Sequence, residues 1–175
     1  MTDHAPLLNE VDTYGPAYMR VAERLGRYDA SEEEAPLAIG LLGLKPGDRV
    51  LDAGCGLGDG LRELHAAYPQ AVLDGIEWSW PVRLLCGLRC RLQRIPARVT
   101  RGDIWQADWS AYDGIYLFQR PESMPRAVAK ARQELRAGAW MASLEFEAQE
   151  LRPVARHLCP DGRPVWLYRA PFRPR

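Results

Sequence analysis

Short apolar runs alternate with longer amphipathic stretches through most of this chain. Five of the apolar runs have the length and composition of β-strands: residues 49–53, 71–77, 97–100, 112–118 and 139–146. Between them, apolar positions at helical spacing predict helices over residues 57–68, 81–94 and 123–135. A short last strand is expected over residues 165–168, after a stretch rich in proline. This alternation predicts an α/β fold, in which a mostly parallel sheet carries helices on both faces.

The residues before the first of these strands predict helices only. We expect helices over residues 16–28 and 31–42, the second of which begins with a capping sequence. A proline–glycine turn at residues 45–48 then ends the helical part. The sequence therefore predicts a helical N-terminal cap over residues 1–44 and a core over residues 45–175, within one domain overall.

Composition narrows the class of protein. The 175-residue chain carries 23 lysines and arginines against 23 aspartates and glutamates, so its formal net charge is zero. Dedicated nucleic-acid-binding proteins usually have a basic excess, and this chain gives no strong signal of that kind. No apolar run approaches the roughly 18 residues of a transmembrane helix, and the acidic start lacks a signal-peptide core. With four cysteines that suggest reduced thiols, we expect a cytoplasmic protein.

The segment after the first strand holds four glycines at alternate positions, Gly54, Gly56, Gly58 and Gly60. It joins a predicted strand to a predicted helix, at the sheet edge where ligands bind in folds of this class. Glycine allows unusual backbone conformations and lets a ligand approach the main chain closely. A glycine-rich turn alone is a weak signal, because tight strand-to-helix turns use glycine in any case.

Three carboxylates accompany this loop, each at the carboxyl end of a predicted strand. Asp52 lies two residues before the first glycine, Glu77 ends the second strand, and Asp103 follows the third. An acid at the end of the second strand can accept both hydroxyls of a ribose, and an acid after the third can accept a hydrogen bond from an adenine amino group. The pattern therefore indicates a ligand that contains adenosine.

A nicotinamide-dinucleotide site is the main alternative, since it also combines a glycine loop with an acid after the second strand. Its G-x-G-x-x-G fingerprint would place the third glycine where this chain has Asp59. A carboxylate at that position is a poor neighbour for a pyrophosphate. Asp52 also suits a cationic amino-acid group better than a dinucleotide, so the spacing favours a different adenosine ligand.

The order D-x-G-x-G-x-G, an acid ending the second strand and an acid after the third resembles the class I S-adenosylmethionine-dependent methyltransferases. Residues 101–105, 112–125 and 165–168 are also similar to one small family of that class. Its eukaryotic members are lysine methyltransferases acting on the mitochondrial adenine nucleotide translocase and the ATP synthase c subunit. The resemblance implies a Rossmann-like fold with sheet order 3-2-1-4-5 plus a short antiparallel final strand. It also implies S-adenosyl-L-methionine as cofactor, with S-adenosyl-L-homocysteine as product.

Carried over by position, the resemblance implies a set of cofactor-binding residues: Asp52, Ala53, Gly54, Cys55, Gly56, Glu77, Trp78, Asp103 and Ile104. The glycine loop would line the methionine part, and Asp52 would hold its ammonium directly or through water. Glu77 would bind the ribose hydroxyls, with Trp78 against the adenine. Asp103 and Ile104 would complete the adenine site, and no metal is needed for this chemistry.

The loop after the fourth strand normally faces the transferred methyl group in this fold. Gln119 is a candidate to accept a hydrogen bond from the acceptor nitrogen, although it has an alternative role in capping the strand. Glu122 is a candidate substrate anchor, because a carboxylate opposes the deprotonation that a base must perform. Only about 18 residues lie between the fifth and last strands, too few for a long helix and a further strand. This leaves the acceptor side open, which suits a protein substrate.

We therefore expect a methyltransferase that modifies a lysine nitrogen of a protein by direct in-line transfer. A methyltransferase of RNA or of a small molecule is one alternative. A non-catalytic module that binds the adenosyl cofactor and serves an interaction role is another. Measurements of cofactor binding and of methyl transfer to each kind of acceptor would distinguish these three possibilities.

Two further features have less specific interpretations. Six arginines and no acid lie between Glu77 and Asp103, a pattern that fits peripheral contact with a membrane or with RNA. The overall neutrality favours solvated arginines on a packed helix instead. Cys86 and Cys90 share a helix face at zinc-compatible spacing, but no nearby motif supplies further ligands, so we expect buried core thiols.

Overall fold

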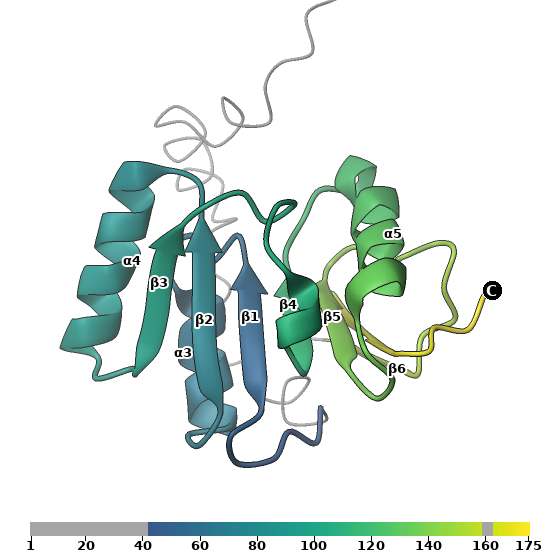
Figure 1. The fold of residues 1–175 in the computed structure, drawn as a ribbon, viewed down its shortest axis with the longest axis horizontal. Helices are drawn as coiled ribbons and strands as arrows, with labels where there is room; N and C mark the ends of the chain where they lie inside the picture. Colours follow the sequence, from purple (N-terminus) through teal and green to yellow (C-terminus); the bar gives the residue numbers. More distant parts are fainter. Residues whose placement is uncertain (1–41, 159–162) are drawn as a thin grey trace, which may run out of the picture. The chain divides into compact units, whose positions relative to one another are not determined.

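The computed structural model describes residues 42–158 and 163–175, and in them seven strands form one sheet of order β3-β2-β1-β4-β5-β7-β6 (Figure 1). The strands are β1 (Arg49–Ala53), β2 (Val72–Glu77), β3 (Ala97–Arg101), β4 (Gly114–Leu117), β5 (Trp140–Leu144), β6 (Ala155–Leu158) and β7 (Pro164–Arg169). The α-helices are α3 (Asp59–Ala67), α4 (Trp80–Leu92) and α5 (Met124–Glu134). Two short 3-10 turns, η2 (Trp109–Ala111) and η3 (Pro121–Ser123), lie in the loops on either side of β4.

The first five strands are parallel, which confirms the predicted α/β fold and the order 3-2-1-4-5. The predicted last strand is β7, and it pairs with β5 in the antiparallel direction. Sequence reasoning missed β6, which pairs with the other edge of β7. This strand has only four residues and follows a proline, so its sequence lacks a clear strand pattern. No helix lies between β5 and β7 in the residues that the structure describes.

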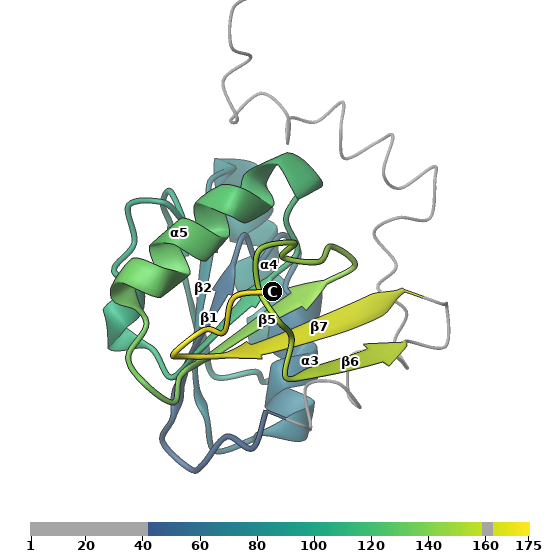
Figure 2. The ribbon, with the colours of Figure 1, turned by 90° about the vertical axis from the view of Figure 1, so that its right-hand side faces the viewer.

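The core lies on both sides of the sheet. Alternate residues of β1 face opposite sides, so Val50 packs in the cluster of α3 and α4, and Leu51 in the cluster of α5. Figure 2 shows α5 on one face of the sheet and α3 on the other. In each cluster the helices contribute fully buried side chains, such as Leu61 from α3 and Ala131 from α5. This packing fixes the carboxyl ends of β1, β2, β4 and β5 at one edge.

The predicted helix and strand boundaries shift by at most two residues, and every predicted element after residue 48 is present. Proline occupies the first turn of α4, as predicted from Pro81. The helices expected before residue 42 lie outside the described residues, so the division at residue 44 stays a prediction. In the part of the chain that the structure describes, no helix has both the length and the apolar sequence that a membrane span requires.

Candidate functional site at the carboxyl edge of the sheet

The glycine loop between β1 and α3 needs its glycines for conformational reasons. Gly54, Gly56 and Gly58 have φ angles of 86°, 51° and 90°, in the left-handed region that other residues rarely adopt. The backbone N–H groups of Gly54 and Cys55 both donate to the carbonyl oxygen of Ile76, at 2.9 and 3.0 Å. These bonds hold the loop against the end of β2, at the edge of the sheet.

Glu77 ends β2 directly beside this loop. One carboxylate oxygen accepts a hydrogen bond from the Gly56 N–H at 3.1 Å, and the other accepts one from the Ser79 N–H at 2.7 Å. The side chain is 8% exposed, and burial raises its pKa although these hydrogen bonds oppose the shift. The loop and the start of α4 are thus tied to one carboxylate.

Asp52 lies beneath the glycine loop, where only 4% of the residue is exposed. Its carboxylate accepts a hydrogen bond from the backbone of Leu61 in the first turn of α3. Burial, followed by the nearby charges of Glu77 and Asp59, raises its pKa to about 8. Asp52 is therefore buried against the first turn of α3, and its contact with the cofactor ammonium, direct or through water, stays a prediction.

Neither carboxylate has a positive partner in the described part of the chain. Among residues 42–158 and 163–175, no lysine or arginine forms an ion pair with Asp52 or Glu77. Two buried acids with raised pKa values favour a bound cation, which would stabilise their ionised forms.

The predicted adenine-site residues lie further along the same edge. Asp103 accepts a hydrogen bond from the Trp105 N–H at 2.9 Å, so this carboxylate fixes its own turn. Ile104 is partly buried, and its carbonyl oxygen accepts from the Trp109 indole at 3.1 Å. Trp78 is 39% exposed and leaves a large aromatic face at the end of β2. The guanidinium of Arg101 lies 5.8 Å from the centre of that ring.

Gln119 links the ends of β1 and β4. Its amide nitrogen donates to the carbonyl oxygen of Ala53 at 3.2 Å, and the side chain is buried. A Cβ at Gly54 would lie 3.0 Å from the same nitrogen, so glycine is needed for this close approach. Glu122 lies on the exposed turn η3 and does not line the neighbouring pocket.

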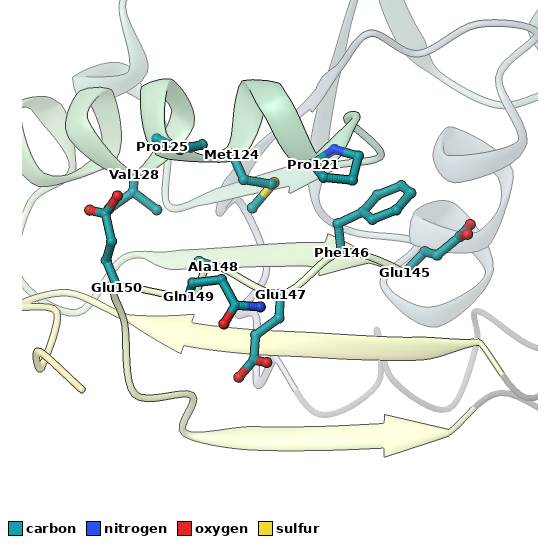
Figure 3. A pocket seen from close by; sticks show the side chains of 10 residues that line it. All are labelled: Pro121, Met124, Pro125, Val128, Glu145, Phe146, Glu147, Ala148, Gln149 and Glu150. Atoms are coloured by element: carbon teal, nitrogen blue, oxygen red, sulfur yellow. The ribbon is translucent and has the colours of Figure 1, made fainter.

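A pocket of about 380 Å³ opens between the start of α5 and the segment after β5. Figure 3 shows Pro121 and Phe146 facing each other at one end, and Val128 near Glu150 at the other. Three glutamates belong to its lining: Glu145, Glu147 and Glu150. Figure 3 shows the Glu150 carboxylate near Val128 and the carboxylates of Glu145 and Glu147 directed away from Val128. The pocket therefore has an apolar floor, and the segment with the three glutamates forms its acidic wall.

The wall of this pocket is held in an unusual conformation. Glu145 has a φ of 70°, which is strained for a residue with a side chain. The Phe118 and Phe146 rings stack with centres 6.3 Å apart, which joins the loop after β4 to the segment after β5. The buried Ser143 hydroxyl donates to the Phe146 carbonyl oxygen at 2.7 Å and fixes that turn. Such strain at the mouth of a pocket marks a candidate functional position.

Sequence reasoning missed this acidic wall. The signal was present, because acids alternate with an aromatic residue in Glu145-Phe146-Glu147 directly after the fifth strand. The predicted fifth strand extends to residue 146 and so includes Glu145 and Phe146, whereas β5 ends at Leu144 and leaves both at the edge of the sheet. Glu147 already pairs with a cation, since the Arg175 guanidinium lies 3.1 Å from its carboxylate.

The cysteines beneath the loop are buried thiols, as predicted for two of them. The sulfur atoms of Cys55 and Cys86 lie 3.8 Å apart, within hydrogen-bond distance, and Cys90 packs beside them. Hydrogen bonding to Cys55 and burial raise the pKa of the Cys86 thiol far above its usual value. Within the described residues, no three side chains of the metal-binding types gather as a ligand set.

Comparisons with known proteins agree with this architecture. The model of the ANTKMT methyltransferase domain family matches residues 52–155, more than half of the chain. No curated protein sequence matches the chain.

Three solved structures illustrate the fold. An RNA methyltransferase from Salinibacter ruber, in complex with S-adenosyl-L-homocysteine, superposes with a TM-score of 0.71 at 18% identity, over 77% of this chain and 88% of that one. Fibrillarin from Aeropyrum pernix, with natively bound S-adenosyl-L-methionine, gives a TM-score of 0.55 at 21% identity, over 76% and 72%. The mitomycin 7-O-methyltransferase MmcR gives 0.70 at 13% identity, over 90% of this chain but 59% of that one.

The family match covers the glycine loop, the acid that ends β2, the loop after β4 and the acidic wall after β5. The structural matches cover the sheet order on which these segments depend. The chain belongs to the ANTKMT methyltransferase domain family and has the fold of the class I S-adenosylmethionine-dependent methyltransferases.

Proposed function

We propose that this methyltransferase transfers the methyl group of S-adenosylmethionine to a lysine nitrogen of a protein substrate. The observation that carries the proposal is the acidic, apolar-floored pocket between α5 and the segment after β5. It lies beside the loop after β4, at the edge that also carries the glycine loop. A long aliphatic stem that ends in a cation matches this combination of surfaces.

The residues of the glycine-loop site fit the cofactor. S-adenosylmethionine carries an ammonium and a sulfonium, and the site offers two buried carboxylates that have no cation among the described residues. Gly54 and Gly56 would receive its methionine part, with Ala53 at the end of β1, Cys55 in the same loop and Asp52 acting from beneath. Glu77 would hold the ribose. When bound, this cofactor supplies a methyl group activated by the sulfonium.

The adenine end of the site has its own candidate residues. The exposed face of Trp78 would lie against the adenine, with Asp103 and Ile104 completing the contact. The hydrogen bond that Asp103 accepts from the Trp105 N–H keeps that carboxylate in a fixed position. Each of these assignments is part of the proposal.

The acidic wall suits an ammonium before reaction. Carboxylates at Glu145 and Glu150 attract a lysine cation, and the Phe118–Phe146 pair offers an aromatic surface for its methylene groups. Bringing a lysine of pKa near 10.4 to its neutral form at pH 7 requires about 4.6 kcal/mol. Nearby carboxylates oppose that step, so we assign them to binding and not to proton removal. The same reasoning makes Glu122 an anchor at the rim.

Gln119 would position the acceptor nitrogen. Its amide nitrogen is engaged with the Ala53 carbonyl, which leaves the amide oxygen as the acceptor group of this side chain. An acceptor N–H that donates to this oxygen would be oriented beside the glycine loop. Orientation of this kind is a major source of rate enhancement in a direct displacement.

A transfer experiment tests the proposal. Purified protein is incubated with methyl-labelled S-adenosylmethionine and an array of peptides that each contain one lysine, beside matched peptides with arginine in its place. We expect label only on lysine peptides, recovered as methyl-lysine after acid hydrolysis. Glu145→Gln should raise KM for the peptide and leave the affinity for S-adenosylhomocysteine unchanged.

Different results would assign a different acceptor. Label that appears in added RNA and is removed by ribonuclease would refute the lysine assignment, as would label confined to small molecules. Binding of S-adenosylhomocysteine without transfer to any acceptor would indicate a non-catalytic binding module. Glu77→Ala is the matched control, because it should abolish both cofactor binding and transfer.

A further inference from the structure

Helix α4 has two apolar faces. One is buried against the sheet and consists of Val82, Cys86 and Cys90. The other is exposed, with fractional exposures between 39% and 75%, and consists of Trp80, Leu84, Leu85, Leu88 and Leu92. A helix packed on a sheet needs only the first of these faces, so the second requires another explanation.

The exposed side chains form one continuous stripe. At 3.6 residues per turn, the five residues fall within an arc of about 140°, with Leu88 near its centre. The buried face is centred about 165° away, on the opposite side of the helix. The stripe therefore points directly away from the sheet along the whole length of α4.

The surroundings of the stripe are positively charged. Arg91 and Arg94 are exposed at the end of α4, and Arg98 is exposed on the adjacent strand β3. No aspartate or glutamate occurs between Glu77 and Asp103 to balance them. Within the described residues, none of these three arginines forms an ion pair.

We propose that the exposed face of α4 docks on an anionic lipid surface, with the helix lying in the plane of the membrane. Leucine and tryptophan side chains would enter the boundary between headgroups and acyl chains. The arginines would remain at the level of the anionic headgroups, with their aliphatic parts beside the leucines. This arrangement is the charge and hydrophobic pattern of an interfacial helix.

Other occupants fit this surface less well. A second copy, related by a twofold axis, would present the same face, which offers no carboxylate of α4 to pair with Arg91 or Arg94. Nucleic acid would match the arginines and leave the leucines without a partner. The lipid surface satisfies both parts of the pattern at once.

Vesicle sedimentation tests the proposal with the full chain. Phosphatidylcholine vesicles with about 30 mol% phosphatidylglycerol are compared with pure phosphatidylcholine vesicles at about 0.15 M salt. We expect partitioning onto the anionic vesicles and a blue shift of tryptophan emission. A variant with Leu88→Gln and Leu92→Gln should lose about tenfold in partitioning. Arg91→Gln and Arg94→Gln should each lose about fivefold, on the anionic vesicles only.

Leu158→Gln is the matched control, because Leu158 is a similarly exposed leucine on β6. It should bind vesicles like the wild type, and thermal melts should show that all variants stay folded. The proposal would be overturned if Leu158→Gln lost as much partitioning as the variant with Leu88→Gln and Leu92→Gln. It would also be overturned if the wild-type protein did not bind anionic vesicles. A dimer in sedimentation analysis that Leu88→Gln dissociates would assign the face to a second copy instead.

Discussion

Gly60 and Gly87 form a matched pair that tests the packing beneath the glycine loop. Both lie in helices, Gly60 in the first turn of α3 and Gly87 in the middle of α4. A Cβ at Gly87 would meet no atom within 4 Å. A Cβ at Gly60 would lie 2.5 Å from the Asp52 carboxylate and 2.9 Å from the Tyr116 ring. The same substitution by alanine therefore has opposite consequences at the two positions.

The magnitudes decide the sign at each position. Alanine in place of glycine in a helix stabilises the folded state by about 0.5–1 kcal/mol, which is the whole effect expected for Gly87→Ala. At Gly60 the same gain competes with overpacking, which costs about 1–3 kcal/mol. Moving the buried Asp52 carboxylate also weakens the hydrogen bond that it accepts from the Leu61 backbone. Complete loss of this hydrogen bond would destabilise the folded state by about 1–3 kcal/mol. We expect Gly60→Ala to lower the free energy of unfolding by about 1–3 kcal/mol.

Thermal and urea denaturation of the two variants, followed by circular dichroism, measure this difference. For a chain of this length, each kcal/mol moves Tm by about 2–4 °C. Gly87→Ala should raise Tm slightly, and Gly60→Ala should lower it by several degrees. The reasoning would be refuted by a Gly60→Ala variant as stable as the wild type, since that would place the carboxylate away from α3.

Three further predictions concern the edge of the sheet. Tyr168→Phe removes the hydroxyl that accepts a bond from the buried Ala148 N–H at 2.9 Å, so unfolding in urea should become easier by about 1–3 kcal/mol; an unchanged midpoint would contradict this. Burial raises the pKa of Asp52 to about 8, above its unfolded value, so the folded state retains a proton that the unfolded state releases. The protonated Asp52 therefore contributes to stability in acid, and this contribution is lost as pH rises through about 8. Asp52→Asn should flatten the resulting fall in the free energy of unfolding, measured by urea denaturation from about pH 5 to pH 8. Glu77→Gln removes a charge from the ribose site, and calorimetry should show S-adenosylhomocysteine affinity lowered at least about tenfold, whereas equal affinity would argue against that contact.

The parts that could be predicted depend on local sequence. The glycines at 54, 56 and 58 are required by the backbone conformation of one turn, and that requirement is visible in the chain itself. Glu77 and Asp103 end or follow strands whose apolar pattern is clear, so their place at the sheet edge followed from the alternation of elements.

The parts that were missed depend on tertiary contacts. Glu145 belongs to the pocket lining because the chain leaves β5 with a positive φ, and the local sequence does not predict this conformation. The second apolar face of α4 was hidden for another reason. Leucines at helical spacing indicate a helix, but spacing alone does not tell which of two apolar faces meets the sheet.

The two outer strands have a consequence for how this protein behaves at high concentration. An outer strand offers unpaired backbone groups to another chain, and charged side chains are a common protection against such pairing. Here β3 carries exposed Arg98 and Arg101, and β6 carries exposed Arg156 above the Trp166 ring. Like charges at both borders repel a neighbouring copy in edge-to-edge approach. We therefore expect the folded chain to resist aggregation through sheet extension.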